Sequence, residues 1–141
     1  MQGYNIIVVF DEKKEKVLLC KRRKSPYKGL SNFVGGKIEP GEEGLHAAYR
    51  ELWEETGISQ EGIDLRHFMD FTYYYDAPNE PCWLEVYVGK LKGPCPVAGD
   101  ENELYWGDIR EDMFDVSRFA GHGNMGHIMA LIAEAGDGVL G

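Results

Sequence analysis

Three glutamates lie close together in the stretch RELWEE, residues 50–55. On a helix, Glu51, Glu54 and Glu55 are spaced i, i+3, i+4 and fall within about 60° of one another on the helix surface. Such like charges repel, and Arg50, four residues before Glu54, offsets only one of them. Because Mg²⁺ and Mn²⁺ prefer carboxylate, carbonyl and water oxygens, the cluster predicts a divalent-metal site.

The segments before this helix would supply the same site with groups that bind phosphate. Gly35-Gly36 permits tight backbone geometry that can aim a carbonyl at a metal or let a phosphate approach. Lys37 and the basic run KRRK, residues 21–24, provide cations for phosphate oxygens. For the glutamate triplet alone, a solvent-exposed helix is the simpler interpretation, because glutamate is a strong helix former.

Apolar runs and turn signals indicate the elements that must position these residues. The predicted elements are, in order, strands at 4–10, 16–22 and 32–38, a helix at 43–56, strands at 65–76, 82–91 and 104–106, and a helix at 125–136. The first two strands are expected to pair antiparallel, as are the fourth and fifth. This order predicts an α/β (α+β) fold in which helices cover both faces of a mixed β-sheet, as one domain spanning residues 1–141.

The predicted helix at 43–56 carries one apolar stripe. Its members recur at helical spacing and are Leu45, Ala48, Tyr49, Leu52 and Thr56. Gly57 supplies a helix stop. Since Leu52 lies opposite the glutamates, the stripe would face the core and leave the carboxylates accessible.

Composition limits the classes of partner. Hydrophobic residues make up 43% and charged residues 28% of the chain, which argues against disorder. The net charge of −9 argues against binding a nucleic-acid polymer or an anionic membrane. The widely spaced Cys20, Cys82 and Cys95 predict reduced thiols, with Cys20 buried in a strand. Without a leader or a membrane-spanning run, we expect a soluble cytoplasmic protein.

The glutamates belong to a longer pattern. It consists of Gly36, five residues, Glu42, seven residues, Arg50-Glu51, an aliphatic residue, one residue, Glu54-Glu55, one residue, Gly57 and an aliphatic residue. This spacing resembles the signature of the Nudix hydrolases and matches it at every specified position. The resemblance implies an α/β/α sandwich, Mg²⁺ or alternatively Mn²⁺ as cofactor, and hydrolysis of a nucleoside diphosphate linked to a further group.

The resemblance also implies roles for individual residues. The implied metal ligands are Gly35 through its carbonyl, Glu51, Glu54 and Glu55. Glu42 would bind metal through water or support the junction between loop and helix. Arg50 would orient the glutamates by salt bridges.

The general base is less closely defined, because in the family it is either a glutamate of the signature or one from a later loop. Here the later loop contains Asp100, Glu101 and Glu103. We predict Glu101, with an exposed loop acid as the alternative for each of the three.

Residues outside the signature point to the substrate. The run NFVGGKIEPGE resembles the MutT-type branch, which cleaves nucleoside triphosphates, including oxidised ones such as 8-oxo-dGTP, to monophosphate and pyrophosphate. In that branch an arginine after the second strand contacts phosphate, which matches Arg22, and Arg23 and Lys37 add positive charge. Asn124 would read a purine edge or cap the last helix. Phe33 would stack on a base or belong to the core.

Other activities stay open. Tyr73-Tyr74-Tyr75 lies where a tyrosine marks Nudix enzymes for dinucleoside polyphosphates, although packing in an aromatic strand is commoner. ADP-ribose hydrolases carry a proline near that distance, and Pro78 lies further along, which weakens that option; a nucleotide sugar is a further alternative. We interpret His122 and His127 as loop or cap residues, and the alternative is that one of them lines the nucleotide pocket.

A protein of another class is also considered, namely a regulatory nucleotide-binding module with the same fold but no turnover. Such modules usually lose glutamates of the signature, and this chain retains all of them. The expected partner is thus a small nucleotide substrate. A homodimer is left open by the sequence.

Overall fold

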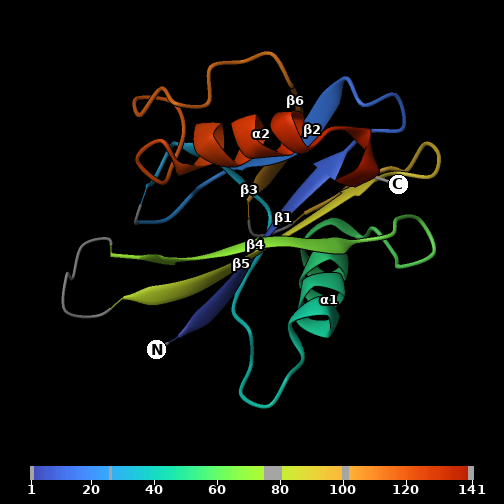
Figure 1. Ribbon diagram of the computed structural model, residues 1–141, viewed down its shortest axis with the longest axis horizontal. Coiled ribbons are helices and arrows are strands. Elements are labelled where there is room, and N and C mark those ends of the chain that lie inside the picture. Colours follow the sequence, from blue (N-terminus) through green and yellow to red (C-terminus); the bar gives the residue numbers. More distant parts are fainter. Residues whose placement is uncertain (1, 26, 75–80, 100–101, 140–141) are drawn as a thin grey trace.

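The computed structural model describes residues 2–25, 27–74, 81–99 and 102–139. The elements are β1 (Gly3–Phe10), β2 (Lys16–Lys21), β3 (Ser31–Phe33), α1 (Gly44–Thr56), β4 (Arg66–Tyr73), β5 (Cys82–Lys90), β6 (Glu103–Asp108), α2 (Asn124–Ala135) and a short 3-10 helix (Asp137–Val139). The predicted order of strands and helices is confirmed, and the 3-10 helix is an addition. Figure 1 shows how they are arranged.

The six strands form one mixed sheet in the order β3-β2-β1-β5-β4, with β6 paired to the other edge of β2. β1 and β5 run parallel, whereas the other pairs are antiparallel. Both predicted antiparallel pairs, β1 with β2 and β4 with β5, are therefore confirmed.

β1 and β2 diverge soon after the turn that joins them, because each then pairs along its length with other strands. The segment that follows β3 fills the opening beside β1. It forms isolated bridges from Val34 to Ile7 and from Lys37 to Tyr4. Gly35 and Gly36 lie between these two bridges, and we call residues 34–37 the glycine loop. The pairing with β1 therefore determines the position of this loop.

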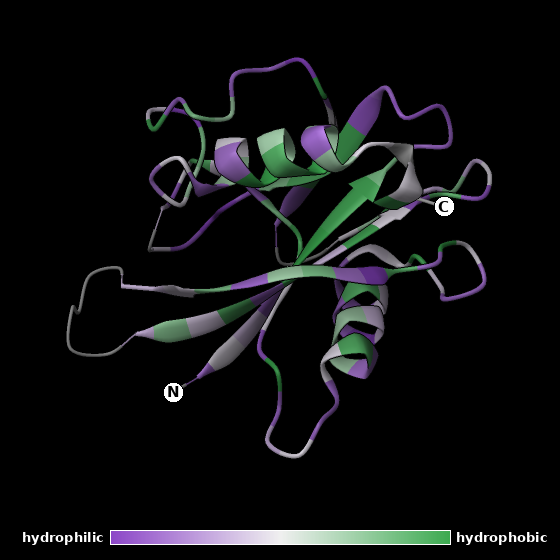
Figure 2. Cartoon of the chain, viewed as in Figure 1, coloured by the Kyte–Doolittle hydropathy of each residue, from purple (hydrophilic) through white to green (hydrophobic). Residues whose placement is uncertain are grey.

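Two hydrophobic layers lie on opposite faces of the sheet, because side chains alternate along a strand. Ile7 of β1 packs in the cluster that contains Leu52 of α1, whereas the next residue, Val8, packs in the cluster that contains Ile128 of α2. Figure 1 shows the two helices on opposite sides of the sheet, and Figure 2 shows the hydrophobic end of β1 between them. The predicted sandwich, with a mixed sheet between two helical layers, is confirmed.

The apolar stripe of α1 is confirmed with one addition. Its buried residues are Ala47, Ala48, Leu52 and Thr56, and Leu45 and Tyr49 are partly buried against the same cluster. Gly57 ends the helix with a φ of 78° and donates its N–H to the Trp53 carbonyl at 2.9 Å. Across the described ranges, no helix is long and apolar enough to cross a membrane.

The described cysteines carry free thiols. Cys20 is buried in the layer that faces α1, as its place in an apolar strand predicts. Cys82 is also buried, and Cys95 is partly exposed.

Candidate functional site

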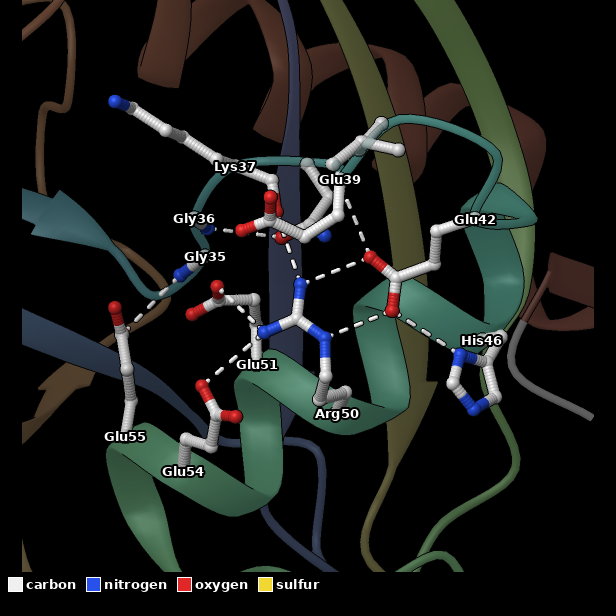
Figure 3. Close-up of polar contacts among 12 residues, drawn as sticks. Gly35, Gly36, Lys37, Glu39, Glu42, His46, Arg50, Glu51, Glu54 and Glu55 are labelled. Carbon is white, nitrogen blue, oxygen red and sulfur yellow. Dashed lines mark hydrogen bonds and ion pairs between the residues drawn. The ribbon is translucent and has the colours of Figure 1, made fainter.

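The three glutamates lie on the face of α1 that looks toward the glycine loop, as Figure 3 shows. Their environments differ. The Glu51 side chain is only 14% exposed, the Glu54 side chain is 55% exposed, and Glu55 is intermediate. The spacing in the sequence therefore predicted the shared face but not the degree to which each carboxylate is enclosed.

Gly36 lies against the Glu51 side chain of α1. A β-carbon at this position would lie 2.3–2.6 Å from the carboxylate atoms of Glu51, so a larger residue would displace that carboxylate from its present position. The neighbouring Gly35 donates its N–H to Glu55 Oε2 at 3.3 Å. The loop is thus shaped to receive two of the three glutamates.

Arg50 holds this region together. Its Nη1 donates to Glu51 Oε1 and to Glu54 Oε2, each at 3.1 Å, and its Nη2 donates to the Lys37 carbonyl at 3.1 Å. It also makes a two-point contact with Glu42, at 2.7 Å from Nε and 2.9 Å from Nη2. The salt bridge to Glu54 follows from the spacing of four residues, whereas the contact with Glu42 depends on the fold of the loop. We use the name acidic network for Arg50, its three glutamate partners and the neighbouring Glu55, that is, for Glu42, Arg50, Glu51, Glu54 and Glu55.

Glu42 has several hydrogen-bond partners. Besides Arg50, it accepts hydrogen bonds from the Glu39 N–H at 3.1 Å and interacts with His46 Nδ1 at 3.1 Å. The hydrogen bonds from Arg50 are the main reason why the pKa of Glu42 falls from 4.5 to about 2. The same contact raises the pKa of Arg50. These contacts favour the supporting role at the loop–helix junction over the role of a water-mediated metal ligand.

The donor atoms of the network suit a hard divalent cation, since they are carboxylate oxygens beside a backbone loop. Their present arrangement is centred on Arg50. Within the part of the chain that the structure describes, no group of three or more His, Cys, Asp or Glu side chains gathers closely enough to hold a metal ion. A divalent cation bound here would compete with Arg50 for Glu51 and Glu54, and waters and substrate phosphates would complete its coordination.

A cleft of about 750 Å³ opens beside the acidic network. Glu51, Glu55 and Gly35 line it, whereas Glu54 does not. Its other walls come from β1, from the segment that joins β2 to β3, and from β3, β4, β5 and α2. The cleft thus brings three of the metal-binding candidates, Gly35, Glu51 and Glu55, to one side of a cavity large enough for a small molecule.

Most of the predicted substrate-binding residues line the same cleft. Four of them do so, namely Arg22, Phe33, Lys37 and Asn124. Arg23 is exposed outside it, and its backbone N–H donates to Asn102 Oδ1 at 3.2 Å. Lys24, which was predicted only as part of the basic run, does line the cleft.

Asn124 does not cap α2, so that interpretation was wrong. The helix begins at Asn124 itself, the N-cap residue is Gly123, and no side chain caps this end. The Asn124 side chain is half-buried in the wall of the cleft. Phe33 is 4% exposed and packs in the layer under α2, so it belongs to the core as well as to the cleft.

Three aromatic side chains from distant segments meet beside the cleft, and we call them the aromatic cluster. The hydroxyls of Tyr27 and Tyr73 are 2.9 Å apart, and the His122 ring lies 5.4 Å from the Tyr27 ring and 6.4 Å from the Tyr73 ring. Tyr27 and His122 both have positive φ angles, 63° and 54°. Tyr73 therefore faces the cleft, where simple strand packing had been the favoured interpretation. Sequence reasoning missed Tyr27 altogether.

Asn5 is a second residue that sequence reasoning missed. It is 3% exposed, lines the cleft, and accepts the Gly36 N–H on Oδ1 at 2.9 Å. The signal was present in the sequence, since asparagine is the polar interruption of an otherwise apolar strand, YNIIVVF.

The candidates for the general base are placed only in part. Asp100 and Glu101 lie outside the described residues, as do Tyr75 and Pro78. Glu103 is exposed at the start of β6, opposite Lys21 of β2. The prediction of Glu101 as base therefore stays a prediction.

Two curated proteins with similar sequences are named for the hydrolysis of nucleotides. The chain is 27% identical over 92 residues to the asymmetrical bis(5'-nucleosyl)-tetraphosphatase of Caenorhabditis elegans, an alignment that covers 64% of this chain and 66% of that protein. It is 41% identical over 59 residues to the CTP pyrophosphohydrolase of Escherichia coli K12, which covers 41% of this chain and 44% of that protein. The chain thus spans two thirds or less of the length of these relatives.

A solved structure shares the fold, and a family model matches most of the chain. An Ap4A hydrolase binary complex from C. elegans superimposes with a TM-score of 0.77 over 96% of this chain and 97% of that one, and at 20% identity this likeness shows the fold. The family model described as NUDIX domain matches residues 2–119. The resemblance that the glutamate signature predicted is thereby confirmed, and the chain belongs to the NUDIX domain family.

Proposed function

We propose that this chain is a Mg²⁺-dependent Nudix pyrophosphohydrolase that converts a nucleoside triphosphate to the monophosphate and pyrophosphate. The observation that carries the proposal is a single cleft in which Glu51 and Glu55 lie with Arg22, Lys37 and Asn124. Carboxylates for a metal, cations for phosphate and an amide for a base are the groups that this reaction needs. The name of the E. coli relative, CTP pyrophosphohydrolase, agrees with a triphosphate substrate.

In this proposal the metal is held by Glu51, Glu54, Glu55 and the Gly35 carbonyl. When bound, a divalent cation would neutralise phosphate charge and polarise the attacking water. Arg50 keeps the glutamates oriented, because it is hydrogen-bonded to Glu51 and Glu54 and is itself anchored by Glu42.

The substrate is positioned by residues on the other walls. Arg22 and Lys37 bind phosphate oxygens, and Asn124 pairs with the edge of a purine. Glu101 accepts the proton of the water that attacks phosphorus, as the phosphoanhydride bond breaks and pyrophosphate leaves. The assignment of Glu101 rests on its position before β6, and Asp100 and Glu103 are its alternatives.

Hydrolysis of dinucleoside polyphosphates is the second candidate function. The aromatic cluster favours it, because aromatic faces stack on bases and Tyr27 and Tyr73 line the cleft. The printed name of the C. elegans relative points the same way. A nucleotide sugar or ADP-ribose is a weaker alternative, supported by no particular contact in the cleft.

A hydrolysis screen in which the nucleotide products are separated and quantified by ion-exchange chromatography tests the proposal. Purified protein would be offered nucleoside triphosphates, including 8-oxo-dGTP, dinucleoside polyphosphates, ADP-ribose and nucleotide sugars, with Mg²⁺, Mn²⁺ or EDTA. We expect triphosphates to be cleaved with Mg²⁺ and no turnover in EDTA. A higher rate on dinucleoside polyphosphates would select the second candidate. Tight nucleotide binding without turnover of any compound would instead support the regulatory module.

Three further predictions accompany this function. We propose that residues 1–141 form one domain and that the protein works in the cytoplasm, because three widely spaced cysteines are typical of a reducing compartment. A homodimer is an open prediction that size-exclusion chromatography with light scattering would decide.

A further inference from the structure

Asn5 is bound to both main-chain groups of Gly36. Its own N–H donates to the Gly36 carbonyl at 2.8 Å, and its side-chain Oδ1 accepts the Gly36 N–H at 2.9 Å. The fit is close on the other side as well, because a β-carbon at Gly35 would lie 2.1 Å from the Asn5 carbonyl. Asn5 therefore anchors the glycine loop to β1.

The orientation of the Asn5 amide follows from this contact. Because Gly36 donates a proton, the atom that faces it must be the oxygen, and the NH₂ group is at the other end of the amide. Asn5 Nδ2 is buried and has no hydrogen-bond partner among the described residues. A buried donor left unsatisfied is costly, so this group is expected to meet an acceptor from outside the chain, either a water molecule or a ligand in the cleft.

The surroundings of Asn5 identify the acceptor. The residue lines the cleft, and Gly36, which it holds, is in contact with the carboxylate of Glu51. Gly35 is bonded to Glu55. Asn5 thus lies next to the residues that would carry the metal, and a metal of this kind is coordinated by substrate phosphates. Phosphate oxygens are acceptors without donors, which suits an amide N–H.

We propose that Asn5 both positions the glycine loop and binds substrate: Oδ1 holds Gly36, and Nδ2 donates to a phosphate oxygen of the bound nucleotide. This inference rests on the proposed function, since it takes the cleft to be the nucleotide site. It adds a substrate contact from β1, outside the glutamate signature and outside the basic run.

The variant Asn5→Asp separates the two roles. Aspartate keeps an oxygen for Gly36 but replaces the donor by a negatively charged acceptor. Calorimetry with a triphosphate analogue whose bridging oxygens are methylene groups, in Mg²⁺, should show binding weakened roughly tenfold or more. Hydrogen exchange at the Gly36 amide should stay slow in Asn5→Asp and become fast in Asn5→Ala, which lacks both groups. Asn5→Asp binding within twofold of the wild type, with Gly36 still protected, would overturn the proposal.

A measurement on the wild type needs no variant to fold. In a ¹⁵N-labelled sample, the side-chain NH₂ signals of Asn5 should shift on addition of the analogue and exchange more slowly with solvent. No shift, or the same shift with a nucleoside that lacks phosphates, would contradict the phosphate contact. Neither readout requires turnover. Failure of hydrolysis with an intact Asn5 shift would therefore count against the proposed function alone.

Discussion

The acidic network and the aromatic cluster border the same cleft but are built in different ways. The contacts of Arg50 join residues that are eight or fewer positions apart, apart from its bond to Lys37. In the aromatic cluster, Tyr27 and Tyr73 are 46 positions apart, and His122 comes from a third segment. One region is thus encoded by a continuous stretch, and the other exists only after the chain has folded.

Under the proposed function, the two regions have different tasks. The acidic network would act on the phosphoanhydride, and the aromatic cluster would select the nucleotide. The acidic network carries the atoms that would act on a phosphoanhydride, and such chemistry is common to many nucleotides. Under the proposed function, the aromatic cluster and Asn124 would contact the part of the nucleotide that differs between substrates. Two of the cluster's members adopt positive φ angles that few non-glycine residues tolerate. Mutations in the first region should therefore affect every substrate, and mutations in the second should change the ranking of substrates.

The largest effect is expected when a metal-binding carboxylate is removed. Glu54→Gln and Glu55→Gln should each lower kcat on every substrate by roughly 100-fold or more, which corresponds to about 3 kcal/mol. Thermal melting should show a folded protein. Glu134→Gln, an exposed glutamate of α2, is the matched control and should behave as wild type. Near wild-type turnover by both variants would contradict the proposed metal site. It would also contradict the expectation that mutations in the acidic network affect every substrate.

A smaller loss of activity is expected from Arg50→Lys. Lysine keeps the charge but cannot form the two-point contact with Glu42 while bonding Glu51 and Glu54. We expect kcat to fall by roughly 10- to 100-fold, again on all substrates alike. Arg110→Lys is the control, because Arg110 makes a two-point contact with Asp108 on an exposed part of the chain. Equal activity losses in both variants would show that Arg50 has no special relation to the site.

Asn124→Ala tests the specificity side of the cleft. The amide is lost from the wall of the cleft, so kcat/KM for purine triphosphates should fall roughly tenfold while pyrimidine triphosphates change little. Stability should change by less than about 0.5 kcal/mol, because Gly123 occupies the N-cap position. The two substrate classes serve as controls for each other within one variant. An unchanged ranking of substrates would remove Asn124 from base recognition.

The smallest effect concerns stability at low pH. The pKa of Glu42 is about 2 in the folded protein, below its ordinary value of 4.5. A lowered folded pKa adds stability that is fully present above pH 4.5 and is lost as the pH falls through 2. The free energy of unfolding in urea should therefore differ between wild type and Glu42→Gln most above pH 4.5, and the difference should shrink toward pH 2. A difference that is constant with pH would mean that the charge of Glu42 does not stabilise the loop–helix junction.

Much of this protein could be predicted from local patterns. The order of strands and helices, the buried stripe of α1 and the stop at Gly57 follow from periodicity and turn residues that act over a few positions. The shared face of Glu51, Glu54 and Glu55 follows from helix geometry alone. The prediction that Asn124 is an N-cap residue was wrong. Sequence patterns indicate that a helix exists more reliably than they indicate the residue at which it begins, and an N-cap depends on that single residue.

The spacing from Gly36 to Ile58 was sufficient to identify the family, because its chemistry depends on neighbours within one loop and one helix. The cleft depended on tertiary structure. β1 and β2 diverge, and the glycine loop fills the opening between them. This arrangement places Asn5, Tyr27 and Tyr73 around the same cavity as Glu51 and Glu55 of α1. Contacts between residues far apart in sequence arise from the pairing of strands and the packing of layers. A local pattern of charge or hydrophobicity therefore does not predict them.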